Sequence, residues 1–316
     1  MTPTPAPAPA PTPAPAPAHG LFVPVLTPFR ADLSVDVPRF LDHCRWLLAH
    51  GADGLAVFGT TSEANSLGVD EKLDLLARLI DEGGIAPDRL LPGTGTCALP
   101  ETVRLTRAAV EAGCRGVLML PPFYYKGVSD DGLFASFDAV IQAVGDRRLR
   151  VYLYHFPQLS QAPLSLDLVG RLIAAHPETV AGLKDSSGDW DNTRALLERF
   201  PGFGVFPGSE ARLLEALRLG APGCISATAN VNPAGIAAVI AGWQAADATE
   251  TQARATQVRA VFNGRPLIPT LKAILADALQ DETWRRPRPP LCPLDAAEGA
   301  LLRETLAGLG VDPARS

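Results

Sequence analysis

Lysine is scarce in this chain of 316 residues, although cations are not. Of the 28 lysines and arginines, only four are lysines, and they stand at Lys72, Lys126, Lys184 and Lys272. Arginine effectively never loses its proton, whereas lysine can lose it and become a nucleophile. The chain therefore uses arginine where a permanent charge is enough, and a lysine kept at a special position is a candidate for chemistry.

Cysteine and histidine are also few, and neither forms a cluster. The five cysteines are Cys44, Cys97, Cys114, Cys224 and Cys292, an odd set without a Cys-x-x-Cys pair. This usage indicates reduced, mostly buried thiols in a cytoplasmic protein. The five histidines show no spacing typical of metal ligands. We therefore expect no metal and no other cofactor.

Long hydrophobic runs and an excess of positive charge are absent as well. No apolar run approaches the roughly 20 residues that a membrane helix needs. The net charge is −6 and the pI is about 5.4, which argues against a surface for nucleic acid. We therefore expect a protein that acts on small molecules and binds neither nucleic acid nor membrane.

The first 18 residues alternate proline with alanine or threonine. Such a segment cannot form a core, so it predicts a disordered, extended tail over residues 1–18. The segment lacks the basic start and the apolar run of a secretory signal. We interpret it as a solubilising tail without a chemical role, and a docking segment for a proline-binding partner is the alternative.

From His19 onward, short β-rich runs alternate with amphipathic helical patterns. Eight candidate strands begin near positions 21, 55, 90, 116, 151, 180, 203 and 223. Strands that alternate with helices indicate a parallel sheet, and eight such units favour a (β/α)8 TIM barrel over an open doubly wound sheet. Further helical patterns follow the eighth strand. We therefore predict an α/β fold with a barrel over residues 19–231 and a C-terminal helical extension over residues 232–316, which packs on the barrel or makes an oligomer contact.

The expected carboxyl ends of the strands carry hydroxyl groups and one lysine. The active site of a TIM barrel lies at these ends. They hold Thr60, Thr61, Tyr124, Tyr125, Tyr154, Lys184, Ser186, Gly208, Ser209, Glu210, Ser226 and Thr228. The lysine follows the apolar run VAGL and precedes the turn DSSGD. An ammonium group at the end of a hydrophobic strand is unusual, so we consider a chemical role for Lys184.

A lysine in a partly dry barrel mouth favours imine chemistry. Loss of water favours the neutral, nucleophilic amine, which attacks a ketone or aldehyde to form a Schiff base. The protonated imine is an electron sink, so a carbon–carbon bond beside it can break or form. A tyrosine supported by other hydroxyls can transfer protons, and the N–H groups of two adjacent threonines at a turn suit a carboxylate. A 2-oxo acid such as pyruvate satisfies all three demands.

Seven motifs occur in an order that is typical of one known family. They are LTPF at 26–29, GTTSE at 59–63, PGTGT at 92–96, PPFYY at 121–125, YLYHFP at 152–157, GLKDSSGD at 182–189 and ISATANV at 225–231. By these motifs the sequence resembles the dihydrodipicolinate synthase / N-acetylneuraminate lyase family of class I aldolases over nearly the whole chain after the tail. The resemblance implies a Schiff-base enzyme that acts on pyruvate and forms a homo-oligomer, a dimer or a tetramer.

The resemblance also implies roles for single residues. Lys184 would be the Schiff-base lysine, and Tyr154 would be the general acid-base. Thr60 and Thr61 would hold the pyruvate carboxylate, with Thr60 linking Tyr154 to Tyr125. In the synthase branch this second tyrosine enters the site of the neighbouring subunit.

Other positions separate the branches of the family. By the resemblance, Ile225 lines the pyruvate pocket through its backbone, and Gly208 is a further substrate-binding position. Ser186 and Glu210 stand where the lyase branch contacts substrate hydroxyls. Leu159 stands where the synthase branch usually has an arginine for the carboxylate of the second substrate. This departure favours a pyruvate-releasing lyase or a dehydratase on a 2-oxo (sugar) acid over dihydrodipicolinate synthesis.

Alternative functions stay open at this point. A 4-hydroxy-tetrahydrodipicolinate synthase or a 2-keto-3-deoxy acid dehydratase would use the same lysine imine. A barrel that binds a 2-oxo acid without turnover would not need an acid-base residue. A metal-dependent aldolase is disfavoured because the sequence has no cluster of metal ligands.

Structural interpretations of the same residues also stay open. Lys184 could be a surface lysine paired with Asp185, and Thr60 and Thr61 could cap a helix with Glu63 reaching back. The side chains of the adjacent Tyr124 and Tyr125 point in different directions, so we expect one of them to be a packing residue. His155 replaces the asparagine that is usual after the tyrosine, and we interpret it as a structural hydrogen-bonding residue.

Overall fold

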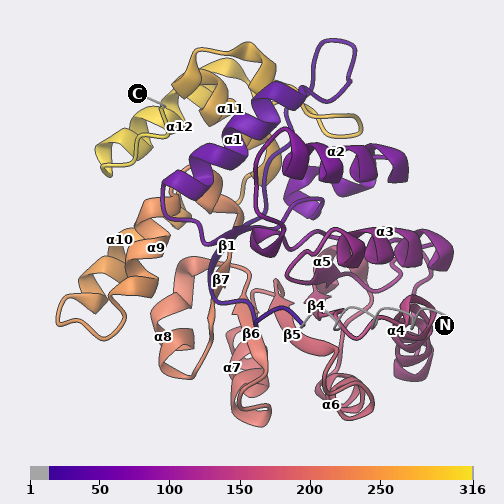
Figure 1. Cartoon of the computed structure of the whole chain (residues 1–316). Helices are drawn as coiled ribbons and strands as arrows, with labels where there is room; N and C mark the ends of the chain where they lie inside the picture. The colour runs from indigo at the N-terminus through magenta and orange to yellow at the C-terminus, as the bar shows by residue number, and fades with distance from the viewer. Residues whose placement is uncertain (1–13, 315–316) are drawn as a thin grey trace, which may run out of the picture.

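Short parallel strands and helices alternate along the chain in the computed structural model, which describes residues 14–314 (Figure 1). The strands are β1 (Gly20–Val23), β2 (Gly54–Leu55), β3 (Val117–Met119), β4 (Val151–His155), β5 (Val180–Asp185), β6 (Gly204–Pro207) and β7 (Gly223–Ile225). They pair in parallel in the orders β2-β1-β7 and β3-β4-β5-β6. The strands are apolar and almost entirely buried, as expected where helices cover a parallel sheet.

The strand expected from residue 90 is not a regular strand. Leu90 bridges Leu55 and Gly93 bridges Leu118, each as an isolated parallel pair. Pro92 cannot donate a hydrogen bond, which interrupts a ladder at this point. The segment nevertheless lies between β2 and β3, so with the seven strands it makes eight positions. The expected (β/α)8 barrel is confirmed.

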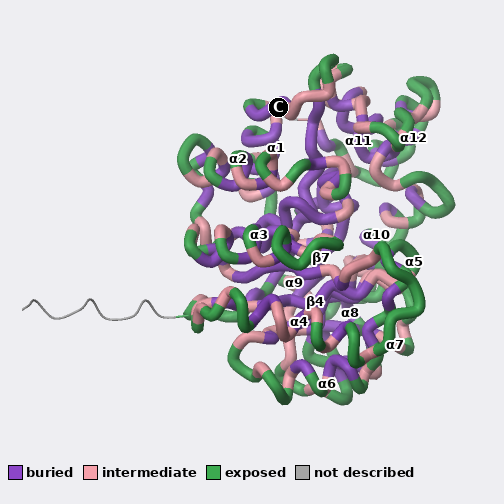
Figure 2. The backbone as a smooth tube through the Cα atoms, turned by 90° about the vertical axis from the view of Figure 1, so that its right-hand side faces the viewer, coloured by how far each residue is buried: buried purple, intermediate pink, exposed green. Residues whose placement is uncertain are grey.

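Eight helices follow these positions and surround the strands in Figure 1. They are α1 (Val37–Ala49), α2 (Val69–Asp81), α3 (Leu99–Glu111), α4 (Asp130–Val144), α6 (Leu166–Ala175), α7 (Trp190–Arg199), α8 (Leu213–Arg218) and α9 (Pro233–Ala241), with a short α5 (Pro157–Ser160) after β4. Each presents an apolar face to the barrel. Figure 2 accordingly shows buried backbone at the centre and exposed backbone at the outer faces of the helices.

The C-terminal extension begins later than the sequence indicates. α9 was expected in the extension, but it packs against β1 and α8 and so completes the ring of barrel helices. The extension consists of α10 (Ala248–Ala260), α11 (Leu267–Leu279) and α12 (Ala296–Gly308). It has an apolar cluster of its own, which includes Phe262, Leu271, Leu275, Trp284, Leu302 and Leu306.

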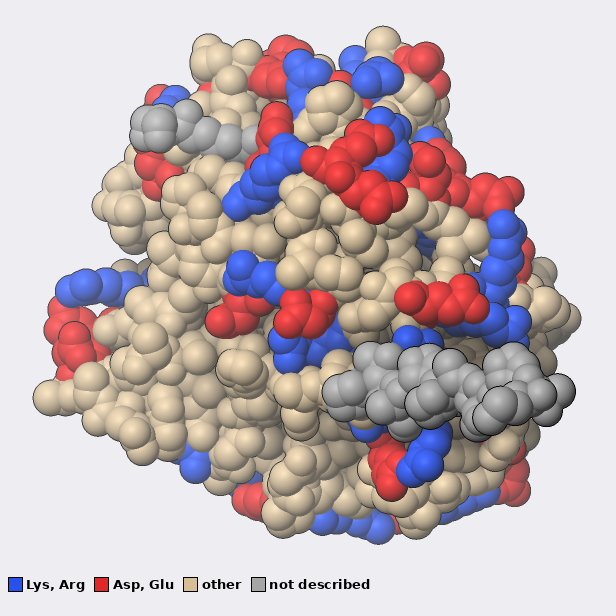
Figure 3. Space-filling view, viewed as in Figure 1, with Lys and Arg blue, Asp and Glu red and all other residues tan. Residues whose placement is uncertain are grey.

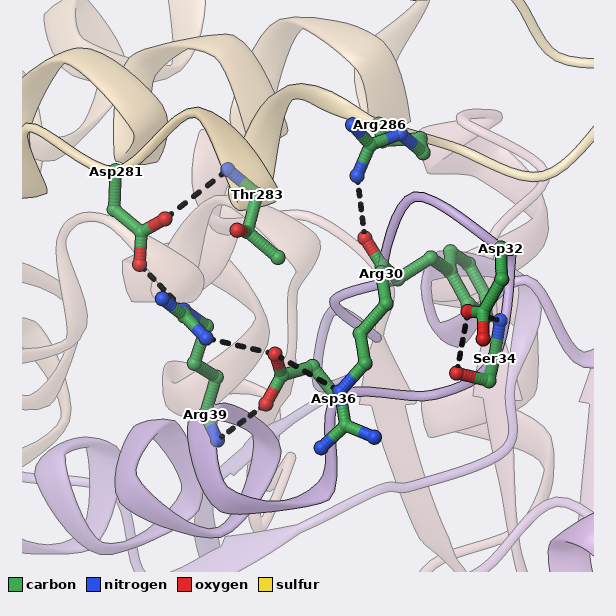
Figure 4. A network of polar contacts seen from close by, with 9 residues as sticks. Arg30, Asp32, Ser34, Asp36, Arg39, Asp281, Thr283 and Arg286 are labelled. Atoms are coloured by element: carbon green, nitrogen blue, oxygen red, sulfur yellow. Dashed lines mark hydrogen bonds and ion pairs between the residues drawn. The ribbon is translucent and has the colours of Figure 1, made fainter.

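Polar contacts fix this extension to the first βα loop (Figure 4). Arg39 of α1 donates to Asp36 and also to Asp281, which follows α11. Arg286 donates to the carbonyl oxygen of Phe29 over 3.0 Å. The contacts of Arg39 with Asp281 and of Arg286 with Phe29 join residues more than 200 positions apart, so the extension is fastened to the barrel end that carries the βα loops.

The end of the proline-rich segment lies against the opposite end of the barrel. Ala18 is 2% exposed, and its N–H donates to the hydroxyl of Tyr152 over 2.7 Å. Arg115 donates to the carbonyl oxygen of Ala16 over 3.2 Å. The expected tail therefore does not reach residue 18, because Ala16 and Ala18 contact the barrel. Residues 1–13 of the expected tail lie outside the described residues.

Charges of both signs are interspersed on the face that Figure 3 shows. Exposed charges of opposite sign form ion pairs, such as Arg104 with Asp70 and Arg45 with Asp42. Within residues 14–314, no helix combines the length and the apolar character that crossing a membrane requires.

Candidate active site

A cavity of about 560 Å³ opens at the carboxyl ends of the strands. Its inner part is lined by residues at or just after the carboxyl ends of β2, β4, β5 and β6, among them Thr60, Thr61, Tyr154, Lys184 and Gly208. The first residues of α11 also line it, so the extension contributes one wall. A concave site with a few converging polar groups is the usual place for a small-molecule ligand.

Lys184 lies near the end of β5 and is only 5% exposed. The register of the sheet places it beside Tyr154 of β4, and its Nζ lies 4.4 Å from the centre of the tyrosine ring. Within residues 14–314 no carboxylate forms an ion pair with this ammonium group. Buried ammonium groups are normally paired, so an unpaired one that faces a cavity is a candidate for function.

Asp185 does not pair with Lys184, although it is the next residue. Its carboxylate accepts hydrogen bonds from the side chains of Thr193 and Asn192 and from the N–H of Ser187. Neighbouring residues of a strand point to opposite faces, so the two charges are directed apart. The interpretation of Lys184 as the exposed partner of Asp185 is therefore wrong.

Tyr154 and Thr60 form a hydroxyl pair above the lysine. Tyr154 is 3% exposed, and its hydroxyl lies 3.2 Å from Oγ1 of Thr60. Thr60 and Thr61 begin a short 3-10 helix, so the first N–H groups of that helix have no partner within it. The structure therefore places the hydroxyl-bearing side chains of Tyr154 and Thr60 in the same cavity as Lys184, as the sequence predicts.

Strained backbone holds the two threonines in place. Phe58 and Glu63, which flank them, have φ of 60° and 58°, in the left-handed region that side chains other than glycine seldom adopt. Glu63 does not reach back as a helix cap, because its buried carboxylate pairs with Lys272 of α11 and accepts from the N–H of Arg288. A buried ion pair from the extension therefore fixes the turn that carries Thr60 and Thr61.

Two further predicted residues line the cavity. Ser186 follows β5 directly, and Gly208 follows β6. The N–H of Gly208 donates to the carbonyl oxygen of Asp185 over 2.6 Å. A Cβ atom at position 208 would lie 2.3 Å from Oγ of Ser186. Glycine is therefore required for the close approach of these two strand ends.

Three predicted site residues are not brought to the cavity. Glu210 is completely buried beneath it and accepts hydrogen bonds from Ser226 and Thr228, so its carboxylate cannot contact a substrate in this structure. Ile225 is buried in the barrel interior beside Phe22 and is not among the residues that line the cavity. Glu210 therefore has a structural role, which corrects its expected one.

Tyr125 is the third of these residues. Its side chain is 73% exposed, as is that of Tyr124, and neither lines the cavity. The expectation that one of the two tyrosines packs in the core is wrong. Within the described chain, Thr60 contacts Tyr154 but not Tyr125.

His155 of β4 is buried beneath the site. Its Nδ1 accepts a hydrogen bond from the N–H of Leu164 over 3.0 Å, which requires the neutral ring. Burial lowers the pKa of His155, and the nearby carboxylate of Asp185 opposes this effect only in part. The residue acts as a hydrogen-bond acceptor within the fold, as the sequence indicates.

The sequence does not reveal the outer wall of the cavity. This wall contains Phe156, Leu159, Trp190, Leu267, Ile268 and Leu291, together with Arg212 and Arg259. Most of these residues look like ordinary packing residues in the sequence, and four of them come from the extension, namely Arg259, Leu267, Ile268 and Leu291. Among residues 14–314, no group of three His, Cys, Asp or Glu side chains is placed to hold a metal ion.

Comparisons with known proteins identify the family of the chain. A model of the Dihydrodipicolinate synthetase family matches residues 17–308. A DapA-like lyase of Chloroflexus aurantiacus is 35% identical over 292 residues, which cover 90% of this chain and 94% of the relative. A 4-hydroxy-tetrahydrodipicolinate synthase of Azoarcus sp. is 34% identical, with 86% and 92% covered.

Solved structures give the same result. The structure of dihydrodipicolinate synthase from Agrobacterium tumefaciens matches with a TM-score of 0.85 and 33% identity, over 92% of this chain and 99% of the other. A prophage protein of the dihydrodipicolinic acid synthase family from E. coli K12, solved in complex with pyruvate, matches with a TM-score of 0.83 and 28% identity, over 93% and 99%. The chain therefore belongs to the dihydrodipicolinate synthetase family, whose members are class I aldolases and lyases.

Proposed function

We propose that this protein is a Schiff-base lyase or aldolase that breaks or forms a carbon–carbon bond to pyruvate, with the pyruvate carried on Lys184. One observation carries the proposal. A buried lysine without a carboxylate partner lies 4.4 Å from the ring of Tyr154, whose hydroxyl lies 3.2 Å from Oγ1 of Thr60. A lysine nucleophile and a hydroxyl acid-base in one cavity are what imine chemistry requires.

The chemistry proceeds in balanced steps. The neutral amine of Lys184 adds to C2 of pyruvate, and the carbonyl oxygen leaves as water. One further proton, supplied by the hydroxyl of Tyr154, gives the protonated imine. Transfer of a proton from C3 to Tyr154 then gives an enamine, and C3 of the enamine attacks the carbonyl carbon of an aldehyde. The aldehyde oxygen takes that proton back from Tyr154 and becomes a hydroxyl, and the protonated imine forms again. Hydrolysis of the new imine releases the product and restores the lysine. In the reverse direction, the same steps cleave a 2-oxo acid into pyruvate and an aldehyde.

Tyr154 is positioned to move the protons in these steps. Either its hydroxyl or that of Thr60 can be the donor in the hydrogen bond between them, so Tyr154 can give up a proton and take one back within the site. We assign the carboxylate of pyruvate to Thr60 and Thr61, since both line the cavity and begin a helix with free N–H groups. Ser186 and Gly208 lie at the ends of the next two strands, within the same cavity.

A synthase is the second candidate, because several relatives carry that name. The Azoarcus relative at 34% identity is a 4-hydroxy-tetrahydrodipicolinate synthase. Leu159 argues against that reaction in this chain, since it lines the cavity and a hydrocarbon side chain cannot bind the carboxylate of a second substrate. A lyase or dehydratase on a 2-oxo acid therefore remains the leading proposal.

We also propose that the chain forms a homo-oligomer, a dimer or a tetramer. The support is the exposed pair Tyr124 and Tyr125, because two large aromatic rings 73% exposed to water are typical of a contact surface. In such an assembly Tyr125 would reach the site of a neighbouring subunit. A cytoplasmic location stays a prediction from the cysteine usage.

Exchange of the methyl protons of pyruvate tests the proposal without knowledge of the aldehyde. In D2O, formation of the enamine replaces C3 protons with deuterium, which proton NMR follows directly. We expect exchange with the wild type, loss of exchange with Lys184→Arg, and normal exchange with Lys126→Arg, which changes an exposed lysine outside the cavity. Exchange that persists in Lys184→Arg would contradict the proposal.

A further inference from the structure

The outer part of the cavity is mainly hydrocarbon. Phe156 and Leu159 come from the segment after β4, and Trp190 begins α7. Leu267 and Ile268 begin α11, and Leu291 lies between α11 and α12. Four separate parts of the chain therefore supply apolar side chains to one space.

This apolar wall begins directly at the reaction centre. The rings of Phe156 and Tyr154 are stacked, with their centres 5.9 Å apart and their planes inclined by 29°. Trp190 follows Lys184 by six positions, across the turn that ends β5. A group attached to C3 of the bound pyruvate therefore leaves the lysine between aromatic and aliphatic side chains.

The polar groups near this wall are mostly engaged already. Arg212 pairs with Glu215 over 3.0 Å, and its guanidinium lies 5.3 Å from the centre of the Trp190 ring. The hydroxyl of Thr193 donates to Asp185, and that of Ser209 accepts from the N–H of Ala211. Arg259 is half-buried and, within residues 14–314, has no carboxylate partner, so a single free cation is left at the rim.

This composition does not suit a polyhydroxylated chain. Each hydroxyl of a sugar acid that enters the cavity gives up hydrogen bonds to water and must find new partners. The outer wall offers few such partners, whereas its hydrocarbon surface favours an apolar group over water. The cavity volume of about 560 Å³ also exceeds what a three-carbon acid needs, and it is within the range of sites for larger ligands.

We infer that the aldehyde joined to or released from pyruvate has an apolar body of aromatic size, not a polyhydroxylated chain. The inference rests on the proposed imine chemistry at Lys184. It changes the expectation from Leu159 alone, which favoured a sugar acid. Leu159 is one member of an apolar wall, and the whole wall is consistent with a hydrocarbon substituent on the substrate.

Aldol addition of pyruvate to two aldehydes tests the inference. Benzaldehyde represents the apolar class and D-erythrose the polyhydroxylated class, and product formation is followed by mass spectrometry. We expect kcat/KM for benzaldehyde to exceed that for D-erythrose at least about tenfold, the scale of one hydroxyl buried without a partner. Equal values, or a preference for D-erythrose, would overturn the inference.

A matched pair of variants links the selectivity to the wall. Leu159→Asn is expected to lower the benzaldehyde-to-erythrose ratio about tenfold, and Leu219→Asn, a half-exposed leucine after α8 outside the cavity, is expected to leave it unchanged. A ratio that is the same in both variants would contradict the inference. Because the readout is a ratio, partial loss of folded protein does not affect it.

Proton exchange of pyruvate separates the two proposals. If the wild type exchanges C3 protons but prefers D-erythrose, the imine chemistry stands and the apolar acceptor is wrong. If the wild type does not exchange C3 protons, the proposed function fails, and the inference about the acceptor falls with it.

Discussion

Replacing Lys272 by methionine is expected to destabilise the protein strongly. Lys272 of α11 is completely buried and pairs with the equally buried Glu63, which follows Thr60 and Thr61 in the chain. Its Nζ also donates to the carbonyl oxygen of Arg286 over 2.9 Å and lies 4.4 Å from the centre of the Phe29 ring. The ion pair therefore joins the extension, the first βα loop and the turn beside the cavity.

The magnitude follows from what the substitution leaves behind. Methionine fills a similar volume, so little packing is lost, but the carboxylate of Glu63 remains buried without its counter-ion. One of its oxygens keeps the N–H of Arg288, over 2.8 Å, and the other faces the lost ammonium group. Removal of one partner of a buried pair costs about 3–5 kcal/mol, because the remaining charge is uncompensated.

Urea titrations followed by tryptophan fluorescence measure this cost. The loss of stability appears as a lower urea concentration at half unfolding, while the dependence of the free energy of unfolding on urea stays the same. All variants are compared at one protein concentration. Arg254→Met is the matched control, since Arg254 pairs with Glu250 on the surface and exposed pairs contribute about 0–1 kcal/mol. The double variant with Glu63→Gln should recover much of the loss, because a neutral amide replaces the buried charge. A Lys272→Met variant within about 1 kcal/mol of the wild type would refute the reasoning.

Further predictions concern the site itself. Tyr154→Phe should still form the imine with pyruvate but should turn over about 10²–10⁴-fold more slowly in steady-state assays, the scale of general acid-base catalysis, and unchanged turnover would exclude that role. Gly208→Ala should lower the free energy of unfolding by about 1–3 kcal/mol in urea titrations, because the added Cβ would lie 2.3 Å from Oγ of Ser186; an unchanged midpoint would show that the strand ends separate freely. His155 has a lowered pKa in the folded state, so the unfolded chain binds the proton first and stability falls as the pH drops through the ordinary value of 6.5. His155→Asn should reduce this acid-side slope in stability measured from pH 5 to pH 8, and an unchanged slope would assign the acid sensitivity to other groups.

Much of the site is predictable because parallel strands place their ends together. Once the sequence shows strands that end at Tyr154 and Lys184, a barrel brings these residues to the same edge, and the sheet register does place them side by side. The same rule places Thr60 and Thr61 at this edge, because they come after the carboxyl end of β2. No contact between distant segments has to be known for any of these placements.

The remaining features depend on side-chain direction and on distant contacts. Glu210 stands at the right strand end, but its carboxylate points inward to Ser226 and Thr228, and sequence position does not fix that direction. The wall at Leu267 and Ile268 lies more than 80 positions after Lys184, and only the packing of α11 brings it to the cavity. Local patterns therefore identify the proposed reaction centre better than the apolar wall of the cavity around it.

Capture of pyruvate with borohydride tests the central claim most directly. Borohydride reduces a lysine imine to a stable secondary amine, and peptide mass analysis then locates it among only four lysines. We predict one reduced pyruvyl group on the peptide that contains Lys184 and none on the peptides with Lys72, Lys126 or Lys272. An adduct on another lysine, or no adduct under conditions in which calorimetry shows that pyruvate binds, would contradict it.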